Sequence, residues 1–343
     1  MSRSTQRRCL VTGGAGFIGS HLAETLVARG DHVVIVDNLS TGRRSNLRNL
    51  TAAQHTFIHA TVSDALRDFA PGEFDEIYHL AAAVGVRLVI ERPIHTIETN
   101  VLESIDLLRF AAAAKTRTLI ASTSEVYGKG SRTPFAEDDD VVYGPTTLNR
   151  WSYACSKAID EYLALAHSRE ESLPVVIVRF FNTVGPRQVG EYGMVLPRFV
   201  SAALAGAPLE VHGDGRQSRC FCDVRDSAPA LPALLASPAC HGRVLNLGDD
   251  KSIQIRDLAE LVKSTLGSHS PIRLVPYDEA FGKNFDDLRD RRPDLSRVRH
   301  AIGFQARIPL AQTIRDLADE LREAAATPAS AAPHARPVEA PLR

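Results

Sequence analysis

Blocks of hydrophobic and polar positions alternate along residues 8 to 128, and they predict strands and helices in turn. Short, nearly continuous apolar runs have the length of buried strands, and the segments between them carry apolar residues at helical spacing. The strand segments read RCLVTG, HVVIVDN, FIHATV, DEIYHLAA and RTLIAST. Strands that are apolar on both faces and alternate with helices are typical of a covered parallel sheet. We therefore predict an α/β fold with a doubly wound parallel sheet.

The pattern changes in the second half of the chain. Residues 151–169 predict a helix and LPVVIVRFFN predicts another strand, but beyond residue 185 proline and glycine become more frequent and the strands become shorter. Those strands are LEVHG, RVLNLG and IRLVPY, with helices near 194–205, 255–266 and 309–325. We predict a first domain over 1–180, a smaller α+β lobe mainly over 181–326 with some segments interchanged, and a disordered tail over 327–343. The cleft between the lobes is the expected binding site.

Composition narrows the class of partner. The chain has 343 residues, 40 Lys and Arg against 41 Asp and Glu, and a net charge of −1, which favours neither nucleic acid nor a membrane as a partner. Its apolar runs are far shorter than the roughly 20 residues of a membrane span, and its first residues lack a signal-peptide pattern, so we expect a cytoplasmic protein. Five scattered cysteines without a CxxC pair indicate reduced thiols and no metal site.

A glycine-rich segment predicts a dinucleotide site. Gly13, Gly16 and Gly19 follow the first strand and precede a helix, so the backbone can approach a pyrophosphate at the helix N-terminus. Asp37 ends the next strand, where a carboxylate binds the adenosine ribose and repels a 2′-phosphate. This favours NAD, although Arg43 and Arg44 follow closely and leave NADP open.

Two further segments carry candidate chemistry. Tyr153 and Lys157 are four residues apart and hence on one helical face, where the ammonium would lower the pKa of the phenol toward working pH. The strand RTLIAST runs into STSEVYG. Since ligands bind at the carboxyl ends of parallel strands, the polar side chains there are candidate substrate contacts rather than a simple strand end.

These motifs together resemble the extended short-chain dehydrogenases/reductases that act on nucleotide sugars, over about residues 8–320. The matching segments are TGGAGFIG, Asp37, HLAA, STSEVYG, YACSK, RFFNTVGPR and GDGRQSRCF. The resemblance implies a Rossmann fold that retains NAD, a nucleoside-diphosphate sugar in the smaller lobe, and usually a homodimer. The dimer contacts would be made by helices 100–114 and 151–169. The apolar stripes of these helices fit packing in the core of a single chain equally well.

The resemblance also implies site residues. Tyr153 would be the base, Lys157 its partner, and Thr123 or Ser124 the hydroxyl that binds the reacting sugar. Cofactor contacts would be Gly13, Gly16, Phe17, Ile18, Gly19, Asp37, Asn38, Asp64, Leu80, Ala81, Ala82, Asn100, Ser122, Tyr153 and Lys157. Substrate contacts would be Asn182, Arg187, Val195, Arg198, His212, Arg219, Arg291 and Arg292. His212 occupies the position at which a tyrosine often stacks on uracil in this family. Alternatively, His212 has only a structural role.

Within this family the chain is most similar to UDP-glucuronate decarboxylases, including that of the lipid A aminoarabinose pathway. STSEVYG, RWSYACSK, QSRCFCDVRD and FGKNFDDLRDRRPD carry this similarity. It implies that Arg291 serves catalysis, and that Glu125 orients the sugar ring or takes part in protonating C5. Thr61 departs from the family pattern, which often has Asp near adenine, and VRLVIERP lacks a tyrosine found in many decarboxylases.

The expected reaction is C4 oxidation of UDP-glucuronate and loss of CO2 from the resulting β-keto acid, giving the UDP-4-keto-pentose or UDP-xylose. A UDP-glucuronate 4-epimerase is the main alternative. A 4,6-dehydratase is less well supported because Ser124-Glu125 supplies one carboxylate where that chemistry usually has an Asp-Glu pair. A protein that only binds NAD and a nucleotide sugar is the non-catalytic alternative.

Overall fold

A computed structural model describes residues 6–85, 89, 91–130, 132–188, 190, 194–281 and 289–326. The predicted disordered tail, the first five residues and half of the VRLVIERP loop lie outside this range.

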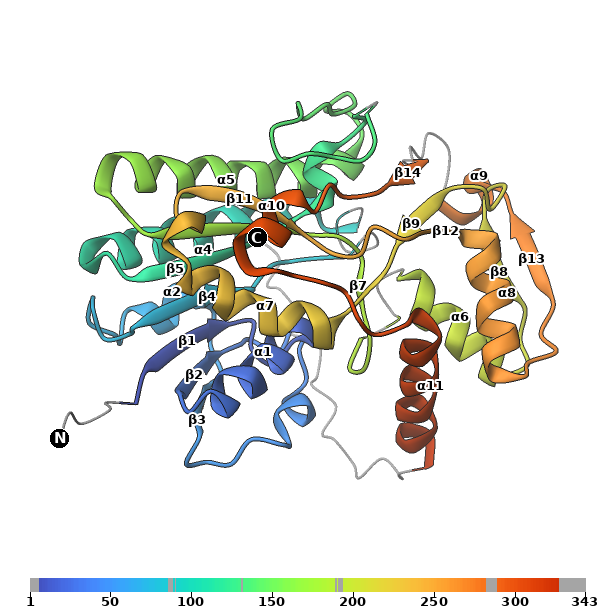
Figure 1. Cartoon of the computed structure of the whole chain (residues 1–343), viewed down its shortest axis with the longest axis horizontal. Coiled ribbons are helices and arrows are strands. Elements are labelled where there is room, and N and C mark those ends of the chain that lie inside the picture. The colour runs from blue at the N-terminus through green and yellow to red at the C-terminus, as the bar shows by residue number, and fades with distance from the viewer. Residues whose placement is uncertain are drawn as a thin grey trace, which may run out of the picture.

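A seven-stranded, all-parallel sheet forms the centre of the molecule (Figure 1), with strand order β11-β6-β5-β4-β1-β2-β3. Its strands are β1 (Arg8–Thr12), β2 (His32–Val36), β3 (His55–Ile58), β4 (Glu76–His79), β5 (Arg117–Thr123), β6 (Val175–Phe180) and β11 (Arg243–Leu247). The chain builds outward from β1 to β3 and then resumes on the other side of β1. This confirms the doubly wound sheet. The switch point, at which the strand order reverses direction, lies between β1 and β4.

Helices cover both faces of the sheet because its central strands are buried on both sides. One layer contains α2 (Val62–Leu66), α4 (Pro93–Ala114) and α5 (Ser152–Glu171). The other contains α1 (Phe17–Ala28), α7 (Val224–Ala236) and α10 (Ser296–Ile302).

A smaller lobe lies beside the sheet (Figure 1) and has an apolar core of its own. Three helices, α6 (Val195–Leu204), α8 (Ile255–Leu266) and α11 (Leu310–Ala326), pack around the paired strands β8 (Leu209–His212) and β13 (Ile272–Val275). The remaining elements are β7 (Thr183–Val184), β9 (Ser218–Cys220), β10 (Cys222–Asp223), β12 (Ser252–Gln254), α9 (Tyr277–Phe281), β14 (Asp290–Arg291) and the 3-10 turns η1 (Arg44–Leu47), η2 (Ser124–Tyr127), η3 (Asn149–Trp151) and η4 (Pro238–Cys240).

Three segments after residue 181, β11, α7 and α10, return to the sheet layers. RVLNLG, expected in the smaller lobe, forms β11, which pairs in parallel with β6 at the sheet edge. Helix α7 was not predicted because Pro229 and Pro232 fall inside it, yet eight of its side chains are buried and its tertiary packing outweighs the two lost backbone donors. No helix in the described ranges has both the length and the apolar character needed to cross a bilayer.

Candidate active site

The glycine loop joins β1 to α1 at the sheet's switch point. Gly13 has φ +67°, and a Cβ there would lie 2.7 Å from the backbone nitrogen of Ala81. A Cβ on Gly19 would lie 2.2 Å from the carbonyl oxygen of Gly13. Only hydrogen at these positions allows α1 to begin so close to β1, which leaves its first N–H groups facing the cavity as a pyrophosphate requires.

Asp37 ends β2 beside this loop. Its Oδ2 accepts the Ala15 amide at 2.9 Å and its Oδ1 accepts the Leu39 amide at 2.8 Å. Burial raises the pKa of Asp37, and these backbone donors oppose the rise. The carboxylate therefore has a fixed orientation. Arg44 stacks over Phe57, with its guanidinium carbon 4.7 Å from the ring centroid, and does not line the cavity.

A cavity of about 480 Å³ runs along the carboxyl ends of the strands. Most of the predicted cofactor contacts line it: Gly13, Gly16, Phe17, Ile18, Gly19, Asp37, Asn38, Leu80, Ala81, Ala82, Ser122, Tyr153 and Lys157. These residues fit a dinucleotide because the narrow glycine cradle and the Asp37 carboxylate lie in one continuous cavity.

Two predicted cofactor residues do not line this cavity. Asp64 is largely exposed on α2, where it accepts a hydrogen bond from Thr61 Oγ1 and pairs with Arg67. Asn100 is buried, and it accepts the Ala83 amide at 2.8 Å and donates to Ser156 Oγ at 3.1 Å. Asn100 therefore does not line the cavity, but it holds the backbone of Ala83, which does.

Thr61 and Glu103 line the cavity where an acidic group was expected near adenine. Burial raises the pKa of Glu103 to about 7, while a hydrogen bond from the Val62 amide lowers it. Glu103 was not predicted as a site residue because the pattern of its helix is that of an ordinary amphipathic helix.

The end of β5 delivers the STSE side chains to the same cavity. The strand ends at Thr123 and turns into the 3-10 segment η2, where the amide of Glu125 donates to Thr123 Oγ1 at 3.2 Å. Thr123 also shares a side-chain hydrogen bond with Tyr153. Ser122 donates to Glu161 at 2.5 Å, so its hydroxyl is tied to α5.

The structure corrects the expected effect of Lys157 on Tyr153. Burial raises the pKa of Tyr153 and the carboxylates of Glu125 and Asp160 raise it further, so the phenol is a weaker acid than usual. Lys157 forms an ion pair with Asp160, with Nζ 2.6 Å from Oδ2, and both side chains are buried. The ammonium is thus neutralised by a carboxylate one turn along α5.

Glu125 is held between two arginines. Its Oε2 is 2.5 Å from Arg150 Nη1 and its Oε1 is 3.3 Å from Arg291 Nη1. Burial would raise the pKa of Glu125, but the two guanidinium charges prevail and lower it to about 2. The carboxyl is therefore ionised at neutral pH, which does not fit the expectation that it protonates C5.

Arg150 was not identified in the sequence. It lies in the RWSYACSK segment three residues before Tyr153, but a single arginine before a helix carries no distinctive signal. The sequence predicted both Arg291 and Arg292 as substrate contacts, but the structure places the two side chains in different environments. Arg291 is buried in β14, opposite Arg219 of β9, whereas Arg292 is exposed and lines neither the cofactor cavity nor the pocket that contains Arg291 and Arg219.

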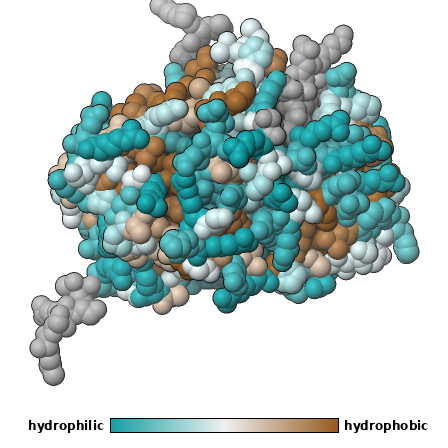
Figure 2. Space-filling model, turned by 45° about the horizontal axis from the view of Figure 1, so that its top comes forward, coloured by the Kyte–Doolittle hydropathy of each residue, from teal (hydrophilic) through white to brown (hydrophobic). Residues whose placement is uncertain are grey.

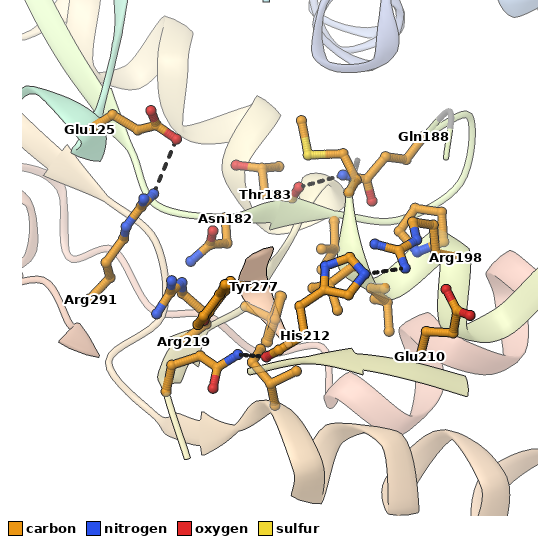
Figure 3. Close-up of a pocket in the computed structure, with 18 of the residues that line it drawn as sticks. Glu125, Asn182, Thr183, Gln188, Arg198, Glu210, His212, Arg219, Tyr277 and Arg291 are labelled. Carbon is orange, nitrogen blue, oxygen red and sulfur yellow. Dashed lines mark hydrogen bonds and ion pairs between the residues drawn. The ribbon is translucent and has the colours of Figure 1, made fainter. Parts of the chain in front are cut away.

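A second pocket of about 190 Å³ extends from Glu125 into the smaller lobe (Figure 3). His212 accepts a hydrogen bond from Arg198, with Nε2 3.1 Å from Nη2, so this histidine has a polar partner and also lines the pocket. Tyr277, which the sequence did not single out, adds an aromatic ring beside it. The other predicted substrate residues that line this pocket are Asn182, Val195, Arg198, Arg219 and Arg291.

Arg187 lies elsewhere, at the wall of the cofactor cavity. Its Nη2 is 2.5 Å from Glu24 and its Nη1 donates to Ser20 at 3.1 Å, so this side chain ties the RFFNTVGPR segment to α1. No group of three or more His, Cys, Asp or Glu side chains in the described part of the chain could hold a metal ion.

Residues 9–248 match the sequence profile of the NAD dependent epimerase/dehydratase family. This chain belongs to that family. It is 39% identical over 319 residues to the UDP-N-acetyl-alpha-D-glucosaminuronate decarboxylase of Bacillus cytotoxicus, covering 93% of this chain and 98% of the relative. It is 34% identical over 319 residues to UDP-glucuronic acid decarboxylase 4 of Arabidopsis thaliana, covering 92% and 69%.

Solved structures give the same fold. The UDP-N-acetylglucosamine 4-epimerase of Methanobrevibacter ruminantium M1, in complex with UDP-N-acetylmuramic acid, matches with a TM-score of 0.83 and 28% identity over 93% of this chain and 99% of that chain. The dTDP-glucose 4,6-dehydratase DesIV of Streptomyces venezuelae, with NAD and TYD bound, matches with a TM-score of 0.81 and 29% identity over 92% and 97%. The chain is thus an NAD-dependent enzyme of the extended short-chain dehydrogenase/reductase type.

Proposed function

We propose that the protein is a UDP-glucuronate decarboxylase. The observation that carries this proposal is Arg291, whose buried guanidinium lines both the cofactor cavity and the second pocket and is held there by Glu125. Arginine recognises a carboxylate through its planar fork, and the cofactor cavity that Arg291 lines is also lined by Thr123 and Tyr153. The two decarboxylase relatives, both acting on UDP-linked sugar acids by name, support the same reading.

The cofactor cavity would hold NAD, with the glycine loop at the pyrophosphate and Asp37 at the adenosine ribose. When bound, NAD supplies a hydride acceptor for C4 of the sugar. Residues of the second pocket would hold the rest of the substrate, with Arg219 and Asn182 at the diphosphate and His212 or Tyr277 against the base.

Tyr153 would take the proton of the C4 hydroxyl as the C4 hydrogen leaves as hydride, with Thr123 fixing that hydroxyl. The 4-keto product is a β-keto acid. Its C5–C6 bond breaks, CO2 leaves, and the bonding electrons pass into an enolate at the C4 oxygen, which Thr123 and Ser124 stabilise by hydrogen bonding. A proton from solvent, added at C5, would then give the UDP-4-keto-pentose, and return of the hydride to C4 with the proton held by Tyr153 would give UDP-xylose. Proton NMR of the reaction mixture distinguishes these two products.

Two alternatives are supported by particular comparisons. A 4-epimerase reaction is supported by the epimerase among the structural relatives, and it would leave the product isobaric with the substrate. UDP-N-acetylglucosaminuronate is a second candidate substrate, because the relative that acts on it is 39% identical over nearly its whole length. Values of kcat/KM for the two UDP-sugar acids, measured side by side, decide between the substrates.

We also propose a cytoplasmic homodimer that uses the outer faces of α4 and α5. These helices carry large apolar side chains that are exposed in the single chain, including Ile94 at 71%, Leu102 at 56% and Tyr162 at 69%. Figure 2 shows brown hydrophobic areas on a face that is otherwise mainly hydrophilic. An apolar face of this kind is typical of a contact surface. The five cysteines are free thiols, as suits a reducing compartment.

A further inference from the structure

We propose that Glu103 recognises the adenine of the bound dinucleotide by accepting a hydrogen bond from its exocyclic amino group. The inference rests on the proposed placement of NAD, with the pyrophosphate at the glycine loop and the adenosine ribose at Asp37. It deepens that placement by naming a cofactor residue outside the sequence motifs. Glu103 belongs to α4 and lines the cofactor cavity.

The order of the strands places the adenine near Glu103. The glycine loop follows β1 and Asp37 follows β2, so a dinucleotide held by both runs toward β3, which is the next strand and the edge of the sheet. Residues 60–62 follow β3 and line this end of the cavity together with Glu103. Helix α2 begins there and shares an apolar core with α4. The adenine, which lies beyond the ribose, therefore falls between these two segments.

The carboxyl group of Glu103 has a fixed partner at this end of the cavity. It accepts a hydrogen bond from the backbone amide of Val62, the first residue of α2. A carboxylate has two oxygens with about four acceptor positions, so one bond from an amide orients the group and leaves it able to accept another from a ligand. Glu103 is partly buried, which strengthens a hydrogen bond made there.

Other polar side chains at this end bond to one another. Thr61 Oγ1 donates to Asp64 at 2.7 Å and accepts the Asp64 amide at 3.2 Å, because Thr61 is the N-cap of α2. Thr99 Oγ1 and His95 Nδ1 are 3.3 Å apart. Among the residues that the structure describes, Glu103 is thus the carboxylate that lines this end of the cavity.

Adenine offers a donor where Glu103 offers an acceptor. The amino group of adenine donates hydrogen bonds, and a bond to a charged acceptor is stronger than one between neutral groups. Hypoxanthine carries a carbonyl oxygen at the same position, which accepts hydrogen bonds and donates none. A carboxylate held by Val62 would face that oxygen as one acceptor against another, which disfavours the hypoxanthine dinucleotide.

The test is a calorimetric titration of the full-length protein, freed of bound nucleotide, with NAD and with nicotinamide hypoxanthine dinucleotide. Burial raises the pKa of Glu103 to about 7, so the titrations are made at about pH 8.5, where the carboxyl is ionised. We expect wild type to bind NAD about tenfold more tightly than the hypoxanthine dinucleotide. Glu103→Ala should lose about tenfold in NAD affinity and most of this preference. Glu260→Ala, at an exposed position of α8, is the matched control.

Glu103→Gln keeps the test decisive if Glu103→Ala folds poorly. Its amide oxygen can accept from adenine and its amide nitrogen can donate to hypoxanthine, so the two dinucleotides should bind with similar affinity. If Glu103 only holds the start of α2 through Val62, both variants would weaken the two dinucleotides equally and the wild-type preference would persist. That result, or a wild type that binds the two dinucleotides alike, contradicts the assignment.

These outcomes are separable from the proposed reaction, because they measure cofactor binding without a sugar substrate. A protein that prefers NAD through Glu103 but releases no CO2 from UDP-glucuronate would keep the assignment of Glu103 and overturn the decarboxylase proposal. A protein that releases CO2 and whose dinucleotide preference is independent of Glu103 would do the reverse.

Discussion

Glu125 is the residue whose interpretation changed most between sequence and structure. The resemblance to decarboxylases marked it as important, and a role in protonating C5 was one expectation. Its position between Arg150 and Arg291, with a pKa of about 2, makes it a permanent anion that positions two cations. A carboxyl with that pKa has no proton to give near neutral pH.

Replacing Glu125 separates positioning from redox chemistry. We expect Glu125→Gln to slow CO2 release by at least about tenfold, because Arg291 loses its fixed partner, while C4 oxidation changes much less. NADH absorbance in single-turnover experiments reports oxidation, and a CO2 assay on the same samples reports bond cleavage. Equal losses in both signals would remove the special role of Glu125.

The pH dependence of C4 oxidation tests the environment of Tyr153. Because the pKa of Tyr153 is raised, chiefly by burial, the rate of proton abstraction should increase with pH up to the alkaline end of the accessible range. Asp160→Asn removes a carboxylate that raises this pKa and releases Lys157 from its ion pair. We therefore expect the rising limb of the pH–rate profile to move to lower pH.

The control for this prediction is Asp257→Asn on α8, outside both cavities. A profile for Asp160→Asn that coincides with wild type, or that moves to higher pH, contradicts the assignment of Asp160 as the partner that restrains Lys157.

At the scale of single residues, residues within motifs could be identified from the sequence more readily than the side chains that contact them. Gly13, Asp37 and Tyr153 stand in recognisable local patterns, so their place in the cavity could be anticipated. Arg150 and Tyr277 could not, because their contacts depend on segments that meet only in the folded chain. The Lys157–Asp160 pair is local to α5 but was not singled out.

At the scale of elements, the β1–loop–α1 unit is the most constrained part of the site. In Gly19→Ala the added Cβ would lie 2.2 Å from the carbonyl oxygen of Gly13, so α1 must move away from the loop. We expect NAD affinity to fall more than about tenfold and the free energy of unfolding to fall by about 1–3 kcal/mol. Calorimetric NAD titration and thermal unfolding measure the two effects.

Gly206→Ala is the matched control for this variant. Gly206 has a left-handed backbone, with φ +67°, unlike the helical Gly19, and a Cβ there meets nothing within 4 Å and lies outside both cavities. It should lower stability somewhat and leave NAD affinity unchanged. If Gly19→Ala binds NAD as wild type does, the close packing of this loop does not matter for the cofactor.

The parallel sheet itself could be predicted because central strands such as β1 and β2 are nearly continuous apolar runs, which reflects burial on both faces. The place of β11 could not, since RVLNLG has the same local pattern whether it pairs with β6 or lies in the smaller lobe. Helix α7 was hidden by its two prolines, and only its packing against α1 reveals why the helix persists.

At the scale of the whole molecule, the proposed homodimer makes a distinct prediction. A charge at Leu102 or Tyr162 on the exposed faces of α4 and α5 should dissociate the dimer, because an unpaired charge in an apolar contact is costly. Light scattering of Leu102→Glu and Tyr162→Glu should give a monomer mass where wild type gives twice that mass. Leu274→Glu, at a 50% exposed position of β13, is the control. A monomeric wild type would contradict the proposal.

We propose that the molecule as a whole removes CO2 from a UDP-linked sugar acid. The most direct measurement is mass spectrometry of the nucleotide sugar after incubation of the full-length protein with UDP-glucuronate and NAD, with Tyr153→Phe as the matched inactive control. We expect a product lighter than the substrate by one CO2, with or without the two further hydrogens removed by oxidation, in the wild-type sample alone. A product of unchanged mass with an inverted C4 centre would contradict it.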